Sequence, residues 1–194
     1  RRDMLSGVII RESGKTWREA DGDVCEAIDF LEYYARQAIG LFEPRRIGQF
    51  IGELDTEFQE PRGVAVIISP WNFPLAICCG MSAAALVTGN TTIIKPAEQT
   101  PGIAKLLVDM LHESGVPRDV VQFVPGKGET VGAQLVRDAR TSLVAFTGSK
   151  AVGLDIVQAC GAVGDEQGWV KRVICEMGGK NAIIVDTSAD LDEA

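Results

Sequence analysis

Apolar residues follow two different patterns along the chain, and the change comes near residue 61. Between residues 23 and 40 they recur at helical spacing, which predicts an amphipathic helix that ends at Gly40. Residues 41–60 carry short apolar alternations between turn residues, which favours a β-hairpin or two short strands. We therefore expect an N-terminal helix and hairpin segment over residues 1–60.

From residue 61 onward, short apolar runs rich in β-branched residues alternate with helical patterns. The apolar runs are typical of strands buried on both faces, and they occupy residues 64–68, 91–95, 120–124, 142–146, 171–175 and 181–185. Helices are expected at residues 75–87, 100–115, 129–138 and 149–160, and Thr100 is suited to be a helix N-cap. This alternation predicts an α/β domain over residues 61–194, with a Rossmann-like parallel sheet and helices on both faces.

An uncharged run from Gly63 to Ile94 raises the question of a membrane span. Pro70, Asn72 and Pro74 interrupt it, together with several glycines and hydroxyl residues. A spanning helix needs about 20 consecutive apolar residues. We therefore expect no membrane-spanning segment, and interpret the run as strand, loop, helix, turn and strand.

Charge and cysteine content narrow the class of protein further. The 194 residues carry a net charge of -8 and no basic stripe, which argues against a nucleic-acid partner because phosphate binding needs a basic surface. Five irregularly spaced cysteines and one histidine disfavour a metal site. Reduced thiols, and no apolar leader after the charged first residues, favour a cytoplasmic protein.

Polar, glycine and proline residues gather where the predicted strands end. In a doubly wound sheet, ligands bind outside the carboxyl ends of the strands. Five successive strand ends are followed by "SPWNFP", "KPAEQTP", "PGKGETVG", "TGSKAVG" and "EMGGKN". One such loop would be routine, but five together predict a ligand cleft.

Two of these loops approach known phosphate-binding patterns. "GKGETVG" has Val131 where a dinucleotide fingerprint needs its third glycine, and "GSKAVG" lacks the Lys-Ser/Thr of a phosphate loop. Taken alone, each is more simply a tight turn. The second loop opens a helix after a buried strand, however, so Gly148 and Ser149 could offer free N–H groups and a hydroxyl to a phosphate.

Other polar residues at the strand ends each allow a plain and a functional interpretation. Lys95 and Glu98 are a solvated loop pair or, in a nucleotide cleft, contacts to ribose hydroxyls. Glu176 is a surface carboxylate or a general base beside flexible glycines. In "SPWNFP", Trp71 and Phe73 are most simply core residues, and Asn72 a turn residue that bonds its own backbone.

Taken together and in this order, "SPWNFPLAI", "KPAEQTP", "VPGKGETVG", "FTGSKAVG" and "EMGGKN" resemble the aldehyde dehydrogenase superfamily. The match covers essentially the whole chain, because "ESGKTWREADGDVCEAIDFLEYYA" resembles the N-terminal helices of that family. "EYYARQ", "KPAEQTP" and "GETVGAQLV" most resemble the branch that oxidises glutamate γ-semialdehyde, the 1-pyrroline-5-carboxylate dehydrogenases. That branch includes the dehydrogenase part of bifunctional proline-utilisation proteins.

The resemblance implies roles for particular residues. Asn72 would donate its side-chain amide to the developing oxyanion, which needs a rigid backbone and a dry surround. Glu176 would activate the water that hydrolyses a thioester. The implied cofactor is NAD, and its implied contacts are Ser69, Trp71, Lys95, Glu98, Gly126, Gly148, Ser149 and Val152.

One part of the family's chemistry has no counterpart among these residues. The family uses a cysteine nucleophile downstream of the "EMGGK" motif, and none of the five cysteines has that context. We therefore interpret the chain as the cofactor-binding part of a dehydrogenase, inactive by itself, whose complete form is a homo-oligomer acting on a small aldehyde. The alternatives are a dehydrogenase for another aldehyde and a non-catalytic nucleotide-binding module.

Overall fold

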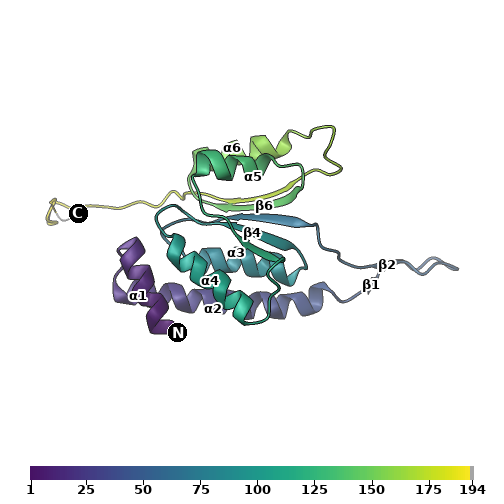
Figure 1. Cartoon of the computed structure of the whole chain (residues 1–194), viewed down its shortest axis with the longest axis horizontal. Helices are drawn as coiled ribbons and strands as arrows, with labels where there is room; N and C mark the ends of the chain where they lie inside the picture. Colours follow the sequence, from purple (N-terminus) through teal and green to yellow (C-terminus); the bar gives the residue numbers. More distant parts are fainter. Residues whose placement is uncertain (193–194) are drawn as a thin grey trace.

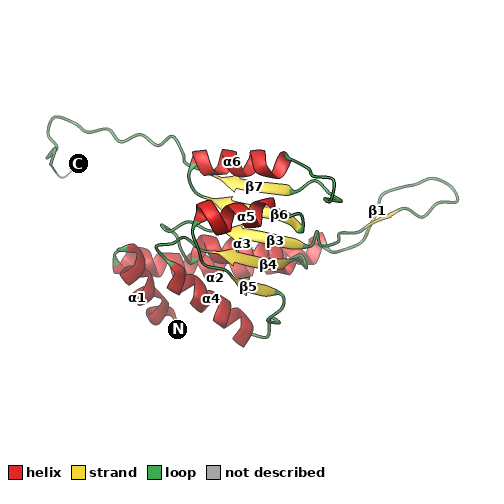
Figure 2. Cartoon of the chain, turned by 45° about the horizontal axis from the view of Figure 1, so that its top comes forward, coloured by secondary structure: helices red, strands yellow, loops and turns green. Residues whose placement is uncertain are grey.

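The computed structural model describes residues 1–192 and confirms the predicted α/β fold. At its centre is a parallel sheet with the strand order β5-β4-β3-β6-β7 (Figure 2). The strands are β3 (Val64–Ile68), β4 (Thr91–Lys95), β5 (Val121–Phe123), β6 (Thr141–Thr147) and β7 (Arg172–Glu176). Ile68, at the end of β3, lies in register with Lys95 and Phe146 on its two neighbours, so the strands end together.

Helices cover both faces of this sheet (Figure 1). One face carries α3 (Ala76–Val87) and α4 (Pro101–Glu113), with α1 (Arg2–Ser13) and α2 (Trp17–Leu41) packed outside them. The other face carries the single π turn η1 (Gly128–Gly132), the short α5 (Ala133–Arg137) and α6 (Lys150–Gly161). The strand order, with β3 in the middle, produces this division because the chain moves outward from β3 in one direction and then in the other.

Each face has its own apolar core. The larger core joins the N-terminal helices to α3, α4 and one face of the sheet, through residues such as Ile9, Val24, Ile67 and Ile103. The smaller core lies under α5 and α6 and includes Val144, Phe146 and Ile156. Because α1 and α2 share a core with the sheet, they pack as part of one body with it; the domain division at residue 60 stays a prediction.

The largest differences from the predicted helix boundaries are in α2 and at residues 129–138, where η1 and the short α5 stand in place of one helix. Helix α2 begins six residues before residue 23, at Trp17, because Thr16 and Glu19 form a reciprocal capping box. It continues past Gly40 to Leu41. Thr100 does occupy the N-cap position of α4, but its hydroxyl makes no capping bond.

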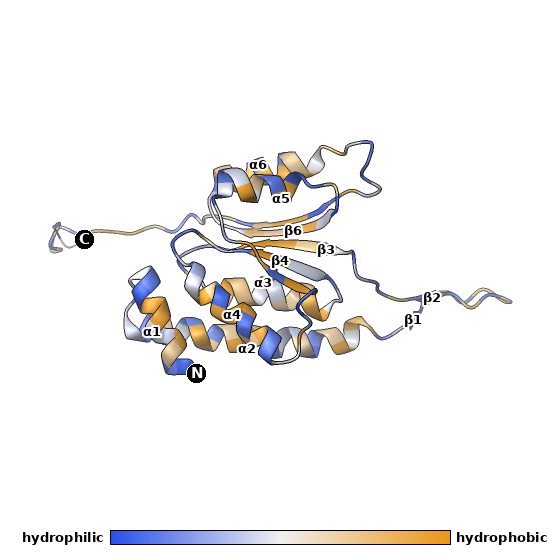
Figure 3. Ribbon diagram, in the orientation of Figure 1, coloured by the Kyte–Doolittle hydropathy of each residue, from blue (hydrophilic) through white to orange (hydrophobic). Residues whose placement is uncertain are grey.

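Residues 41–60 form the expected hairpin, which projects from the body of the protein (Figure 1). Its strands β1 (Arg45–Arg46) and β2 (Thr56–Glu57) are short and antiparallel. The hairpin ribbon carries hydrophobic positions (Figure 3). Their side chains are exposed, namely Ile47, Phe50, Ile51, Leu54 and Phe58.

The prediction of a strand at residues 181–185 is wrong for this structure. The segment is extended chain that leaves the sheet after β7 (Figure 1), and Ile183 and Ile184 are 87% and 92% exposed. An apolar run indicates side chains that tend to be buried. A strand also needs a hydrogen-bonding partner, and none lies beside this segment within residues 1–192.

Candidate cofactor and active site

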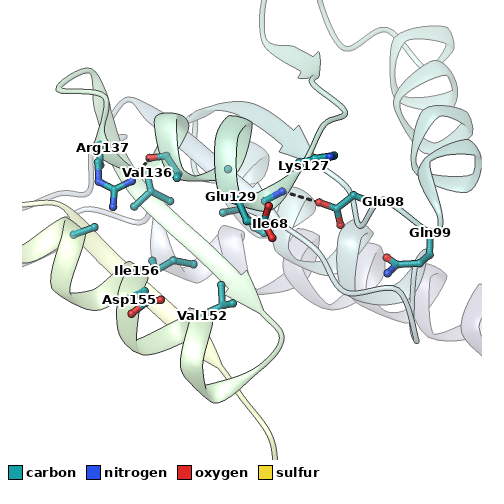
Figure 4. A pocket seen from close by; sticks show the side chains of 14 residues that line it. Ile68, Glu98, Gln99, Lys127, Glu129, Val136, Arg137, Val152, Asp155 and Ile156 are labelled. Atoms are coloured by element: carbon teal, nitrogen blue, oxygen red, sulfur yellow. Dashed lines mark hydrogen bonds between the residues drawn. The ribbon is translucent and has the colours of Figure 1, made fainter.

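The main cleft lies between α5 and α6, above the carboxyl end of β3 (Figure 4). Its volume is about 680 Å³, which is within the range of small-molecule and cofactor sites. Two helical faces with the same i, i+3, i+4, i+7 spacing form its walls. They are Glu129, Gly132, Ala133 and Val136 on one side and Val152, Asp155, Ile156 and Ala159 on the other.

Glu98 borders the cleft and is held in place by two bonds. Its Oε1 accepts hydrogen bonds from Lys95 Nζ at 2.8 Å and from the Gly128 backbone N–H at 2.7 Å. Lys95 is 3% exposed, whereas the Glu98 side chain is 45% exposed, so the carboxylate can still accept bonds from a ligand. Burial opposes its ionisation, but the bonds from Lys95 and the backbone prevail and lower the pKa of Glu98.

The loop after β5 approaches Glu98 through a π turn. The Gly132 N–H bonds the Lys127 carbonyl five residues back, at 3.3 Å, and isolated π turns of this kind are frequent at functional sites. Gly126 is required sterically, because a Cβ there would come within 2.5 Å of Val131 Cγ2. Val131, the residue that breaks the dinucleotide fingerprint, therefore packs against position 126, where only a glycine leaves room for its side chain.

The loop between β6 and α6 differs from its expected role in one respect. Ser149 is the N-cap of α6, and its hydroxyl oxygen accepts from the Val152 N–H at 3.4 Å. The Gly148 N–H donates to the Glu176 carbonyl at 3.1 Å, so the expected free N–H at Gly148 is wrong in this structure. The Ser149 hydroxyl keeps its own proton available for a ligand.

The "SPWNFP" loop follows β3 and is largely exposed. The prediction that Trp71 and Phe73 are core residues is wrong, because they are 52% and 43% exposed. Asn72 is exposed as well, and its carboxamide makes no hydrogen bond within the described chain. The dry surround expected for it is not formed by residues 1–192. Ser69, in contrast, is buried, and its N–H donates to the Lys95 carbonyl at 3.3 Å.

Glu176 ends β7 at the same edge of the sheet. It lies in register with Thr147 on β6, and its side chain is exposed. The parallel strands thus bring Asn72 and Glu176 to one edge, with β6 between the strands that carry them.

The five cysteines make poor nucleophiles in this structure. Burial raises the pKa of Cys78 to about 11 and, assisted by Cys78, that of Cys79 to about 12. Burial also raises the pKa of Cys160 and of Cys175, and the thiolate is the reactive form. Cys25 lies in α2 and is not among the residues that line the cleft.

Of the proposed cofactor residues, Glu98 and Val152 line the main cleft, and Lys95 reaches it through Glu98. The other five are not in its lining but lie in the loops that follow β3, β5 and β6, namely Ser69, Trp71, Gly126, Gly148 and Ser149. Apart from Val152, the residues of the two helical walls were not predicted. Their i, i+3, i+4, i+7 spacing is visible in the sequence, but the same spacing is typical of a helix face that packs on a core.

Within residues 1–192, no helix is both long enough and apolar enough to cross a bilayer. A parallel sheet with polar loops at its carboxyl edge and a cleft between two helices defines a ligand-binding α/β domain. The aldehyde dehydrogenase family model matches residues 1–194, and the chain belongs to that family.

The similar proteins agree on one branch of the family. The chain is 48% identical over its whole length to the 1-pyrroline-5-carboxylate dehydrogenase of Anoxybacillus flavithermus, and covers 38% of that protein. It matches the Thermus 1-pyrroline-5-carboxylate dehydrogenase solved with bound NAD at a TM-score of 0.88 and 45% identity, over 91% of this chain and 34% of that one. It matches proline utilization A of Bdellovibrio bacteriovorus at a TM-score of 0.86 and 49% identity, over 99% of this chain and 21% of that one. The chain thus spans well under half the length of these relatives.

Proposed function

We propose that this chain is the NAD-binding part of a dehydrogenase that oxidises glutamate γ-semialdehyde, the open form of 1-pyrroline-5-carboxylate, to glutamate in proline catabolism. The observation that carries the proposal is the cleft between α5 and α6 with the Glu98 carboxylate held at its rim. The identity to 1-pyrroline-5-carboxylate dehydrogenases supports the choice of substrate.

The cleft fits a dinucleotide in shape and in chemistry. Val136, Val152 and Ile156 offer apolar surface to an adenine ring, and the half-exposed Glu98 carboxylate can accept from ribose hydroxyls. A carboxylate at that place repels a 2′-phosphate, which favours NAD over NADP. NAD, when bound, would supply the acceptor for the hydride of the aldehyde.

Residues of this chain would then act on the groups at the reacting carbon. The Asn72 amide would donate a hydrogen bond to the oxygen that becomes negative when the carbonyl is attacked. The Glu176 carboxylate would take the proton of the water that releases the acid. Ser149 would bond the pyrophosphate of the cofactor at the N-terminus of α6.

We further propose that the complete enzyme is a cytoplasmic homo-oligomer. Free cysteines within the described part of the chain support the cytoplasm. The exposed apolar hairpin supports association, because contiguous apolar surface of that kind marks contact sites.

The test is to assay NADH formation by the complete enzyme with glutamate γ-semialdehyde and with other small aldehydes. We expect the highest kcat/KM for glutamate γ-semialdehyde with NAD, and none of this turnover from residues 1–194 alone, because their thiols are buried or remote. Better turnover of another aldehyde would favour the alternative substrate. NAD binding without turnover by the complete protein would favour a non-catalytic nucleotide-binding module.

A further inference from the structure

Two N-terminal residues contact the loop that carries Asn72 and the start of the helix that follows it, although they lie more than 45 positions earlier in the sequence. Lys15 lies in the turn between α1 and α2, and Asp23 lies in the second turn of α2. Helix α2 packs directly against α3, the helix that follows the loop (Figure 1).

Asp23 is a buried carboxylate with two partners. Its side chain is fully buried, its Oδ2 lies 2.9 Å from Lys15 Nζ, and its Oδ1 accepts from the Ala76 N–H at 2.6 Å. Ala76 is the first residue of α3, and this helix has no side-chain cap of its own. A helix begins with unpaired N–H groups, so a carboxylate from α2 supplies the cap that the local sequence lacks.

Lys15 contacts the loop itself, three residues before Ala76. Its ammonium lies 3.9 Å from the centroid of the Phe73 ring, a geometry that attracts a cation to the ring face. The contact matters because Phe73 is 43% exposed, so the core does not enclose its ring. The two contacts, at Phe73 and Ala76, lie one and four residues after Asn72.

An ion pair in which the Asp23 side chain is fully buried and the Lys15 side chain is 13% exposed is a costly way to stabilise a fold. Taking two charges out of water costs about as much as their attraction returns, and apolar side chains would fill the same space in a core made largely of them. What an ion pair adds is a fixed direction, because each oxygen must meet its own donor. The loop that the pair fixes carries Asn72, and the proposed oxyanion contact depends on where that carboxamide points.

We infer that Lys15 and Asp23 are positioning residues for Asn72, holding its loop so that the carboxamide points to the reacting oxygen. This inference rests on the role of Asn72 in the proposed function. Neither residue lines the cleft between α5 and α6, and in this inference each acts through the loop.

The experiment compares Asp23→Asn with Asp21→Asn in the complete enzyme. Asp21 is the matched control because it lies in the same helix and pairs with Arg2, but has no contact with the loop. A displacement of about 1 Å in a catalytic group can lower the rate by about a hundredfold, so we expect Asp23→Asn to lower kcat by about tenfold to a hundredfold. The KM for NAD should stay unchanged, and Asp21→Asn should resemble the wild type in both.

A double-mutant cycle separates positioning from general stabilisation. If Asp23 acts through Asn72, then Asp23→Asn should lower kcat much less in an Asn72→Ala background than in the wild type. Equal effects in both backgrounds, or an unchanged kcat in Asp23→Asn, would overturn the inference. If Asp23→Asn does not fold, Lys15→Met is the second variant, because it removes only the cation, and it should lower kcat. Lys15→Arg keeps the cation and should restore most of the rate that Lys15→Met loses.

A second readout does not depend on turnover. Hydrogen exchange of the amides in residues 71–76 should be faster in Asp23→Asn than in Asp21→Asn, because the cap on α3 is weakened. Unchanged exchange in this loop would contradict the inference by itself. An inactive wild type would instead count against the proposed function, and the exchange experiment would still test the hold on the loop.

Discussion

The two faces of the sheet are built differently. On one face, four helices share a continuous apolar core with the strands, and carboxylates from the N-terminal helices cap the helices beneath them. Glu12 of α1 accepts from the Gly102 and Ile103 N–H groups at 2.8 and 2.9 Å, as Asp23 does from that of Ala76. This replaces the missing cap at Thr100.

On the other face, a short helix and a longer one stand apart and leave a cleft (Figure 4). The end of α5 is held by one buried ammonium, since Lys171 Nζ donates to the Val136 and Asp138 carbonyls at 2.7 Å each. Burial lowers the pKa of Lys171. The comparison indicates that one face supplies stability and the other supplies binding surface. Changes in the apolar core of the packed face, away from Lys15 and Asp23, should therefore separate in their effects from changes in the cleft.

The largest expected effect on stability comes from the packed face. Ile9 on α1 is fully buried, and Ile9→Ala should lower the free energy of unfolding by about 2–5 kcal/mol because it leaves a cavity. Chemical denaturation of the complete enzyme measures this. Ile9→Val should cost about 0.5–1.5 kcal/mol, and kcat and KM per folded molecule should stay unchanged in both. A raised KM for NAD would show that the two faces are not separable.

Asn72 lies at the border of the two faces and should affect the rate alone. Asn72→Ala in the complete enzyme should lower kcat by about a hundredfold to a thousandfold, the usual loss for one oxyanion donor. The melting temperature should not change, because the carboxamide makes no hydrogen bond within residues 1–192. If Asn72→Ala instead lowers the melting temperature and leaves kcat per folded molecule unchanged, Asn72 is a turn residue and not an oxyanion donor.

A substitution in the cleft should change the preference between NAD and NADP. Glu98→Gln removes the charge but keeps an oxygen for the Gly128 N–H, and we expect the preference for NAD over NADP in kcat/KM to narrow by about tenfold. Glu129→Gln is the matched control, since it also borders the cleft but bonds neither Lys95 nor Gly128. An equal effect from the control would assign the preference to net charge instead of to Glu98. Because the pKa of Glu98 is lowered, its charge should persist as the pH falls through the ordinary glutamate range.

The smallest expected effect concerns Ser149. Ser149→Ala removes the cap of α6 and should lower the free energy of unfolding by about 1 kcal/mol. If the hydroxyl also bonds the cofactor, the KM for NAD should rise, whereas Ser149→Thr should keep both properties. A change in stability without any change in KM would leave Ser149 as a helix cap only.

The sequence was sufficient for the centre of the sheet because β3, β4 and β6 are largely buried and carry apolar, β-branched runs. The edge strand β7 is more exposed, but its alternation with helices still marked it. The same rule gave a false strand at 181–185, since an apolar run does not say which strand it will pair with. The prediction that aromatic side chains belong to the core was also wrong for Trp71 and Phe73, because their loop lies at the surface.

The candidate site was predicted only where a motif marks it. Glu98 and Val152 were named in advance, but the walls of the cleft were not, because small and apolar residues at helical spacing look like an ordinary core. Contacts between distant segments, such as Asp23 with Ala76, leave no local pattern and became visible only in three dimensions.

The π turn at Gly128–Gly132 has a consequence for how the gene can vary. Such a turn holds one residue more than an α-helical turn, and each residue of an α-helix advances by about 100°. Deleting one codon here would let α5 continue as a regular helix and rotate Glu129 away from the cleft, while drawing Gly128 off the Glu98 carboxylate. Among natural variants, this turn should therefore accept substitutions far more readily than changes in length.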